Sequence, residues 1–314
     1  MTTFLSGGTG TPKLLDGAHD VLDGFTVVVN TGDDVEVAGN LVCPDVDTVL
    51  YTLSDRIDRE RWWGIDGDTH ATHEALVRNG ERIERVEATC PLGEGRAFSG
   101  DGEFMLIGDK DRATHIVRSS ALDSGATLTE ATGRIGSWLG VPDEERVLPV
   151  TDDRVATHIE TEEGALAFQV WWVGRGGEPE PQGVEVRGAE TARATGEAVE
   201  ALSDDVIIGP SNPVTSIGPM LAVDGVREGL RETHVVAVSP FVGGGVVSGP
   251  AARLMHATDL PASSQGVYEA YSDFLDVLVV EGEDPDVECR VVETDTSIET
   301  RRDAARLTET LIDL

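Results

Sequence analysis

Short apolar runs alternate with a helical pattern near the start of the chain. Thr2 to Leu5 leads directly into glycines, and Pro12 then occupies a position suited to the first turn of a helix that continues to about Leu22. Phe25 to Asn30 is an almost continuous apolar run, which is typical of a strand covered on both faces. Strand, glycine turn, helix and strand form a βαβ unit, so this region predicts a parallel sheet with a right-handed crossover.

The pattern changes twice along the rest of the chain. Helices are predicted over Pro44–Leu53, Asp111–Ser120, Leu128–Leu139 and Thr300–Leu311. Short strand-like runs in the middle indicate a separate layer, at Thr157–Thr161, Ala165–Val173 and Gly183–Arg187. Parallel-strand character returns at Asp205–Ile208, Val235–Val238 and Leu275–Val280. These elements predict an α/β fold: a Rossmann-like parallel sheet core over residues 1–147 and 200–314, with a smaller α+β domain inserted at 148–199.

The chain is strongly acidic. Lys and Arg total 24 against 58 for Asp and Glu, which gives a formal net charge of -34. A field of that sign repels nucleic acid and anionic membrane surfaces, so we expect neither as a partner. Acidic chains can also be disordered, but hydrophobic residues make up 39% of this one and fall in regularly spaced runs, which predicts a folded protein. A carboxylate-rich surface suits a salt-rich cytoplasm, where ions screen the repulsion.

The sequence favours a cytoplasmic location. Thr2 to Ser6 enters the glycines directly and does not resemble a signal peptide, and no apolar stretch approaches the about 20 residues that span a bilayer. The cysteines Cys43, Cys90 and Cys289 are odd in number and lack CxxC spacing, which predicts reduced thiols.

The loop after the first strand is rich in glycine and contains one of only two lysines in the chain. Glycines let backbone N–H groups approach a phosphate, the following helix N-terminus adds a favourable dipole, and a lysine adds a compact charge. The spacing matches neither the P-loop nor GxGxxG, and a tight turn that needs glycine for its backbone is the alternative. We predict a phosphate- or nucleotide-binding loop made of Gly7, Gly8, Thr9, Gly10, Thr11 and Lys13.

Two adjacent carboxylates, Asp33 and Asp34, follow the second predicted strand. Mg2+ prefers one or two carboxylates together with phosphate oxygens, so such a pair can hold it. In a chain with 58 acidic residues, a pair that merely faces solvent is the alternative. A metal role is favoured because the pair lies at the same edge of the sheet as the glycine loop.

Two later loops also follow predicted parallel strands, at Gly209–Pro219 and Ser239–Ala251. Their proline, glycine and small hydroxyl residues suit close contact with the sugar, phosphates or base of a nucleotide, although such turns are common. Ligands bind at the carboxyl edge of open α/β sheets. We therefore predict nucleotide contacts from Ser211, Asn212, Pro213, Gly243 and Gly244.

The second lysine, Lys110, lies in the segment Gly108 to His115, at the predicted start of a helix. The alternative to a functional role is a helix capped by Asp111 with an exposed lysine beside it. We interpret His115 as a structural or ligand-orienting residue rather than a general base.

Taken in order, these segments resemble the 2-phospho-L-lactate transferases of coenzyme F420 biosynthesis. The resemblance covers nearly the whole chain and rests on SGGTGTPKLLDG, NTGDD, PDVDTVLYTLSDRIDRERWWGI, GDKDRATHIVRS, GPSNPVTSIGP and VSPFVGGGVVSGPA. It implies a Rossmann-type core with a smaller α+β domain, Mg2+ as cofactor and a homodimer. The acidic composition is similar to that of haloarchaeal proteins.

The resemblance also implies a reaction. The family transfers the 2-phospholactyl group of lactyl-2-diphospho-5′-guanosine to 7,8-didemethyl-8-hydroxy-5-deazariboflavin, giving coenzyme F420-0 and GMP, and the family's deazaflavin contacts correspond here to Asp47 and Lys110. Relatives often have arginine at the latter position. We expect Asp34 and Asp47 to be catalytic, binding the metal and orienting the acceptor hydroxyl. Trp62 and Trp63 either line the deazaflavin site or pack in the core. Whether the donor carries a lactyl, enolpyruvyl or glyceryl group is left open by the sequence.

Two other functions fit parts of the pattern. Regulators that bind nucleotide sugars begin with a similar glycine loop, but they usually show Gly-Gly-Ser-Ser-Gly after the paired aspartates, where this chain has Val35 to Asn40 (VEVAGN). An NAD-dependent dehydrogenase needs GxGxxG and an acidic residue at the end of the second strand, which here ends in Asn30. Both departures favour the transferase, and a non-enzymatic regulator of related fold is the alternative that we retain.

Overall fold

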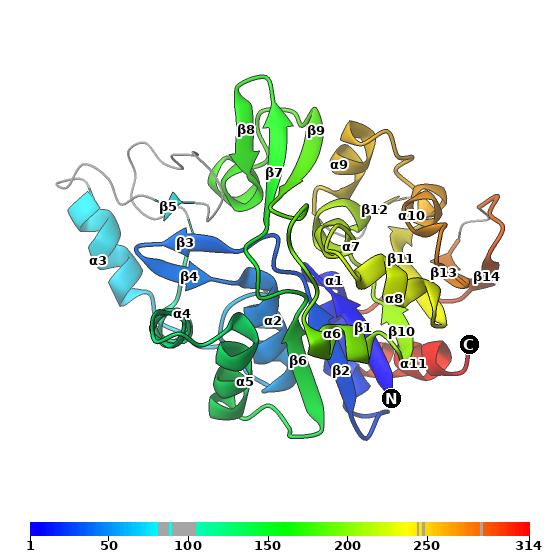
Figure 1. Ribbon diagram of the computed structural model, residues 1–314, viewed down its shortest axis with the longest axis horizontal. Coiled ribbons are helices and arrows are strands. Elements are labelled where there is room, and N and C mark those ends of the chain that lie inside the picture. The colour runs from blue at the N-terminus through cyan, green and yellow to red at the C-terminus, as the bar shows by residue number, and fades with distance from the viewer. Residues whose placement is uncertain (81–87, 90–104, 244, 247–248, 283–284) are drawn as a thin grey trace.

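Seven parallel strands among the described residues form the central sheet (Figure 1). The structure is a computed structural model that describes residues 1–80, 88–89, 105–243, 245–246, 249–282 and 285–314. In chain order the strands are β1 (Thr2–Ser6), β2 (Phe25–Val29), β6 (Glu145–Pro149), β10 (Asp205–Ile208), β11 (Val235–Val242), β13 (Val277–Glu281) and β14 (Arg290–Glu293). A short strand, β12 (Gly245–Val246), pairs antiparallel with β11. The predicted α/β fold with a parallel core is confirmed.

The order of the strands places a crevice beside β1. Across the sheet they follow the order β14-β13-β11-β10-β1-β2-β6. The chain builds outward from β1 through β2 to β6, then crosses back to β10 and builds in the opposite direction. This is the Rossmann arrangement extended by one strand. In such sheets ligands bind where the direction reverses, which here is at the carboxyl ends of β1 and β10.

Alternate residues of the strands enter two separate layers of the core. Phe4 and Val27 pack into one buried cluster, whereas their neighbours Leu5 and Val28 pack into another. All four side chains are fully buried. This explains why the strands read as continuous apolar runs rather than as an alternating pattern.

Helices cover both faces of this sheet. The layer around Phe4 contains α1 (Gly10–Ala18), α2 (Pro44–Leu53), α5 (Leu128–Leu139) and α11 (Arg301–Ile312). The layer around Leu5 contains α6 (Gly196–Ala201), α7 (Gly218–Leu221), α8 (Val226–Arg231), α9 (Ala251–Ala257) and α10 (Ser264–Tyr271). The predicted helices are confirmed as α2, α5, α11 and α4 (Asp109–Asp123). No helix in the part of the chain that the structure describes is long and apolar enough to cross a membrane.

Two small antiparallel sheets lie above the ends of the parallel strands in Figure 1. One consists of β3 (Val35–Val37), β4 (Asn40–Val42) and β5 (Ala88–Thr89), and α3 (Ala71–Gly80) lies beyond it. The other consists of β7 (Ala156–Thr161), β8 (Gly164–Ala167) and β9 (Gly183–Arg187). The second sheet confirms the separate layer of strands that the sequence predicts in this region.

The predicted strand Ala165–Val173 is wrong in its second half. β8 ends at Ala167, and a single π-helical turn, η1 (Val170–Gly174), follows it. The turn buries Trp171 completely, and the indole N–H of Trp171 donates to the carbonyl oxygen of Pro179 at 2.7 Å. A short apolar run does not distinguish a strand from a buried helical turn, which is why the pattern misled the prediction.

The layer β7–β9 shares a hydrophobic core with the parallel sheet. Ile159, Phe168 and Trp171 belong to the same buried cluster as Leu5 and Val28. The division of the chain into a core and a smaller domain at 148–199 therefore stays a prediction, although the change of architecture falls in this stretch.

Candidate active site

The loops after β1 and β10 meet where the strand order reverses. The space between them admits no side chain: a Cβ on Gly10 would lie 1.8 Å from the carbonyl oxygen of Pro210, and one on Gly7 would lie 2.4 Å from that of Ser216. Gly8 has a φ of +64°, in the left-handed region that favours glycine. The glycines are therefore required by packing and by backbone shape.

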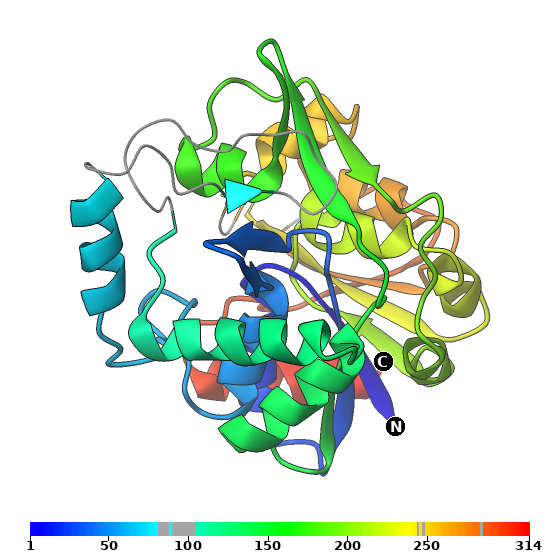
Figure 2. The same cartoon turned by 60° about the vertical axis from the view of Figure 1, so that its left-hand side comes forward.

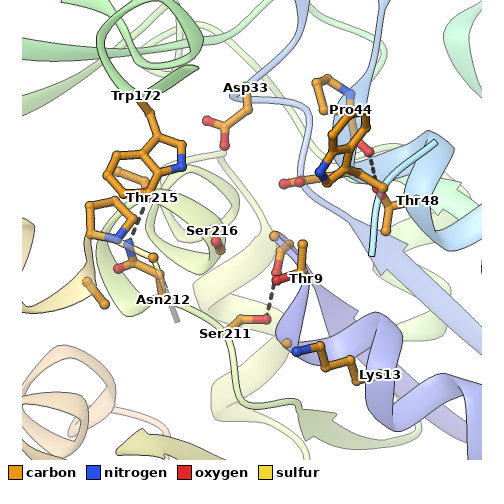
Figure 3. A pocket seen from close by; sticks show the side chains of 18 of the residues that line it. Thr9, Lys13, Asp33, Pro44, Thr48, Trp172, Ser211, Asn212, Thr215 and Ser216 are labelled. Carbon is orange, nitrogen blue, oxygen red and sulfur yellow. Dashed lines mark hydrogen bonds between the residues drawn. The ribbon is translucent and has the colours of Figure 1, made fainter. Parts of the chain in front are cut away.

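A cavity of about 660 Å³ opens over these loops (Figure 3). Gly7 to Gly10 line it together with Lys13, and Figure 3 shows Asp33 at the opposite end of the view. Burial lowers the pKa of Lys13, whose Nζ lies 5.6 Å from the ring centroid of Trp62. A half-buried ammonium beside the loop and the N-terminus of α1 is suited to an anionic phosphate.

Buried carboxylates form another wall of the cavity. Asp33 follows β2, and Asp45 and Asp47 lie in the first turn of α2. The fully buried Asn30 holds this wall in place, because its side-chain amide donates to Asp45 at 2.9 Å and to the carbonyl oxygen of Thr215 at 3.3 Å. One side chain thus connects the loop after β2 with α2 and with the loop after β10.

Three of the carboxyl groups have raised pKa values. Burial, together with the neighbouring Asp45, raises the pKa of Asp33 well above its usual range. Burial also raises the pKa of Asp45 to about 6 and the pKa of Asp34 to about 8. Asp34 lies behind the cavity wall and accepts a hydrogen bond from the thiol of Cys43 at 3.0 Å. Crowded, buried carboxyls disfavour being ionised together, and a bound cation would remove that penalty.

Asp47 is ionised despite its burial. Burial alone would raise its pKa, but the fully buried guanidinium of Arg118 lowers the pKa of Asp47 to about 2. Arg118 is ion-paired with both carboxylate oxygens of Asp47, and its Nη1 donates to one of them at 3.0 Å. His115 Nε2 lies 3.2 Å from Asp47 and 3.2 Å from Asp111, which accepts a hydrogen bond from the Tyr51 hydroxyl at 2.7 Å. This network holds the Asp47 carboxylate in one orientation.

One face of α4 supplies three members of the network. Asp111, His115 and Arg118 follow the helical spacing i, i+4, i+7 and are buried, whereas Ile116 and Val117 are 53% and 42% exposed. Figure 2 shows α4 passing beneath the β3–β4 hairpin. Arg118 was not among the predicted site residues. The signal that could have found it is this inverted pattern, with polar residues on the buried face of a helix and apolar residues outside.

The donor set fits a divalent cation such as Mg2+. Asp47, Asp111 and His115 each bring a ligand atom to within 4.8 Å of the others, and within the described ranges this is the one such group of three or more. Asp33 Oδ1 and Asp34 Oδ1 are buried and have no hydrogen-bond partner among the residues that the structure describes. Carboxylate oxygens beside a phosphate loop are the ligands that Mg2+ prefers.

Many of the residues predicted from the sequence meet at this cavity. Those that line it are Gly7, Gly8, Thr9, Gly10, Lys13, Asp47, Ser211 and Asn212. Thr11 and Pro213 lie outside the lining. The hydroxyl of Thr11 shares a hydrogen bond with that of Ser211 at 2.7 Å, and Pro213 begins the turn η2 (Pro213–Ile217). Both therefore shape the loops rather than face the space between them.

Two further predicted binding residues lie outside the cavity lining. Lys110 is exposed at the start of α4, outside the cavity lining, and its Nζ donates to the carbonyl oxygen of Gly67 at 3.3 Å. Gly243 is exposed between β11 and β12, and Gly244 falls outside the described residues. Of the two adjacent tryptophans, Trp63 lines the cavity, whereas Trp62 packs against the core.

Proteins that are similar in sequence to this chain share one name. A family model described as 2-phospho-L-lactate transferase CofD matches residues 2–313. The 2-phospho-L-lactate transferase of Haloarcula marismortui is 50% identical over 98% of this chain and 96% of its own length. That of Halobacterium salinarum is 47% identical over 98% of this chain and 95% of its own length. That of Methanosarcina acetivorans is 44% identical over 99% of this chain and 98% of its own length.

A solved structure supports the fold. A protein member of the UPF0052 family from Bacillus halodurans matches with a TM-score of 0.60 and 17% identity, covering 99% of this chain and 98% of that one. At this identity the likeness concerns the fold alone.

Proposed function

Because the chain belongs to the 2-phospho-L-lactate transferase family, we propose that it transfers the 2-phospholactyl group from lactyl-2-diphospho-5′-guanosine to the deazaflavin acceptor, giving coenzyme F420-0 and GMP. The observation that carries this proposal is one cavity in which the glycine loop and Lys13 meet the carboxylates Asp33, Asp45 and Asp47. We further propose a cytoplasmic homodimer, on the family resemblance alone.

In the proposed reaction the terminal ribityl hydroxyl of the deazaflavin attacks the phosphorus that carries the lactate. A bond forms between that oxygen and phosphorus, the diphosphate bridge breaks, GMP leaves in line, and the hydroxyl proton is released to water. The charge that develops on the phosphate oxygens faces Lys13 and the amides of Gly7 to Gly10. Asp47, which Arg118 keeps ionised and fixed, accepts a hydrogen bond from the hydroxyl and orients it.

We propose Asp34 and Asp47 as metal ligands, together with Asp33, which lines the cavity. Asp111 and His115, whose ligand atoms lie within 4.8 Å of that of Asp47, are proposed to complete the set. Mg2+ bound by these carboxylates would neutralise charge on the phosphate oxygens. A chelator is therefore expected to abolish GMP release by the purified protein in molar KCl, and an excess of Mg2+ is expected to restore it. Full activity in a chelated sample shown by elemental analysis to be free of metal would contradict this role.

Replacing Lys13 with methionine removes the compact charge from the phosphate loop but keeps most of the side-chain volume. We expect kcat/KM for the guanosine-linked donor to fall by about 10²- to 10³-fold, as for other groups that stabilise transition-state charge. Lys110→Met is the matched control, because that lysine is exposed and lies outside the cavity lining. We propose Lys110 as a deazaflavin contact, so this control is expected to raise the KM for the acceptor and to leave kcat/KM for the donor unchanged. A Lys13→Met enzyme with wild-type kcat/KM would refute the phosphate-loop assignment.

The proposal as a whole is tested by incubating the protein with donor, deazaflavin acceptor and Mg2+ in molar KCl, and by following both products chromatographically. Equal amounts of GMP and phosphorylated deazaflavin are expected. A folded protein that binds a nucleotide sugar without turning over either substrate would instead favour the regulator function.

A further inference from the structure

The cavity has two apolar walls with the glycine loop between them. One, the helix-side wall, consists of Pro44, Tyr51, Trp63, Met105 and Ile107, on or beside α2 and ahead of α4. The other, the insertion wall, consists of Phe168, Gln169, Trp172 and Val173, and it comes from η1 and the two residues between β8 and η1. Two apolar walls on either side of a phosphate-binding floor suit two planar rings joined through a phosphate group.

The π-helical turn η1 determines which side chains of this segment line the cavity and which are buried. Residues 168, 169, 172 and 173 line the cavity, whereas Val170 and Trp171 between them are buried in the core. Figure 3 shows the Trp172 side chain above Asn212 and Thr215, which belong to the loop after β10. An indole at this position offers a flat face to a ligand that sits over that loop.

Contacts behind the insertion wall connect it with α9. The guanidinium of Arg253, from α9, lies 5.5 Å from the centroid of the Trp171 ring and donates to the carbonyl oxygen of Gly177 at 2.7 Å and to Glu180 at 2.6 Å. The ring centroids of Trp171 and Trp172 are 5.9 Å apart. Arg253 thus connects this segment with α9, and Trp172 packs beside a fully buried ring, which favours a preorganised stacking surface.

The in-line geometry of the proposed reaction indicates which substrate lies against which wall. In an in-line displacement the attacking and leaving oxygens lie on opposite sides of the phosphorus. Asp47, which is proposed to orient the attacking hydroxyl, lines the cavity from α2, the helix that also carries Tyr51 of the helix-side wall. The acceptor therefore approaches from that side, and the leaving nucleotide extends toward the insertion wall.

We propose, on the basis of the proposed function, that the guanine ring of the donor stacks on Trp172 and that the Gln169 amide contacts the polar edge of the base. Gln169 is 8% exposed and lines the cavity beside this indole. Its amide carries both a donor and an acceptor, as the edge of guanine does. The insertion β7–β9 is thereby a specificity element for the nucleotide, and the deazaflavin ring belongs to the helix-side wall.

Binding measurements on single variants test this assignment without requiring turnover. GDP and the deazaflavin are titrated separately by calorimetry, in molar KCl with Mg2+, into the wild-type protein and Trp172→Ala. Loss of a stacked base is expected to weaken GDP binding by about tenfold and to leave deazaflavin binding unchanged. Trp172→Phe keeps a stacking face and is expected to retain most of the GDP affinity, which controls for damage to the fold.

Two further variants test whether the effect of Trp172→Ala is specific to the nucleotide. Trp63→Ala, on the helix-side wall, is expected to show the opposite selectivity and weaken only the deazaflavin. Trp138→Ala, on the outer face of α5 where the indole is 56% exposed, is expected to change neither affinity. Loss of deazaflavin but not GDP affinity in Trp172→Ala overturns the wall assignment alone. A wild-type protein that does not bind GDP overturns the proposed function together with it.

Discussion

Asp47→Asn is expected to abolish phospholactyl transfer and to lower the free energy of unfolding by about 3–5 kcal/mol. The substitution leaves the guanidinium of Arg118, which is fully buried, without the carboxylate that pairs with it. An uncompensated charge in the core is one of the most destabilising changes that a single substitution can make. Urea unfolding in molar KCl and the GMP assay measure the two effects separately.

A double variant separates stability from chemistry at this position. Arg118→Leu together with Asp47→Asn removes the unpaired charge, so much of the lost unfolding free energy is expected to return. Transferase activity is not expected to return, because no carboxylate is left to orient the acceptor hydroxyl. A double variant that recovers activity along with stability would show that Asp47 is a structural residue.

Gly10→Ala is expected to destabilise the protein by more than about 3 kcal/mol and to lower the transfer rate by at least about 10²-fold. The new Cβ would lie 1.8 Å from the carbonyl oxygen of Pro210, so the loops after β1 and β10 must move apart. That movement shifts the phosphate loop relative to the carboxylates.

The matched control for this substitution is Gly133→Ala. Gly133 lies in α5 on an exposed face, with nothing within 4 Å of the added methyl group. We expect this change to raise the free energy of unfolding by about 0.5–1 kcal/mol, since alanine favours the helix, and to leave activity unchanged. Similar effects of the two substitutions in thermal unfolding would argue against the close approach of the two loops.

The parallel core could be predicted from sequence because its strands are covered on both faces. Val27, Val28 and Val29 are all fully buried, so β2 appears as an unbroken apolar run. The carboxyl ends of such strands lie at one edge, which brought the glycine loop and the Ser211 loop together in the prediction. β6 was not predicted as a core strand, since it begins with the half-buried charged residues Glu145 and Arg146.

The buried polar network around Asp47 could not be predicted from local sequence patterns. Asp47 and Arg118 are separated by 71 positions, and their pairing depends on how α4 packs beside α2. In a chain with 58 acidic residues, no local feature distinguishes a buried carboxylate from one that faces salt water. The insertion wall was missed for a related reason, because the run around Trp172 reads equally as a strand and as a helical turn.

The central claim is that the acceptor hydroxyl displaces GMP within this one cavity. Its most direct test follows GMP release with Mg2+ and donor in the presence of either the deazaflavin or an analogue that lacks only the terminal ribityl hydroxyl. We expect one GMP for each coenzyme molecule with the true acceptor and no GMP with the analogue. Equal GMP release with both compounds would mean that water, not the acceptor, attacks the phosphorus, and it would contradict the transferase mechanism.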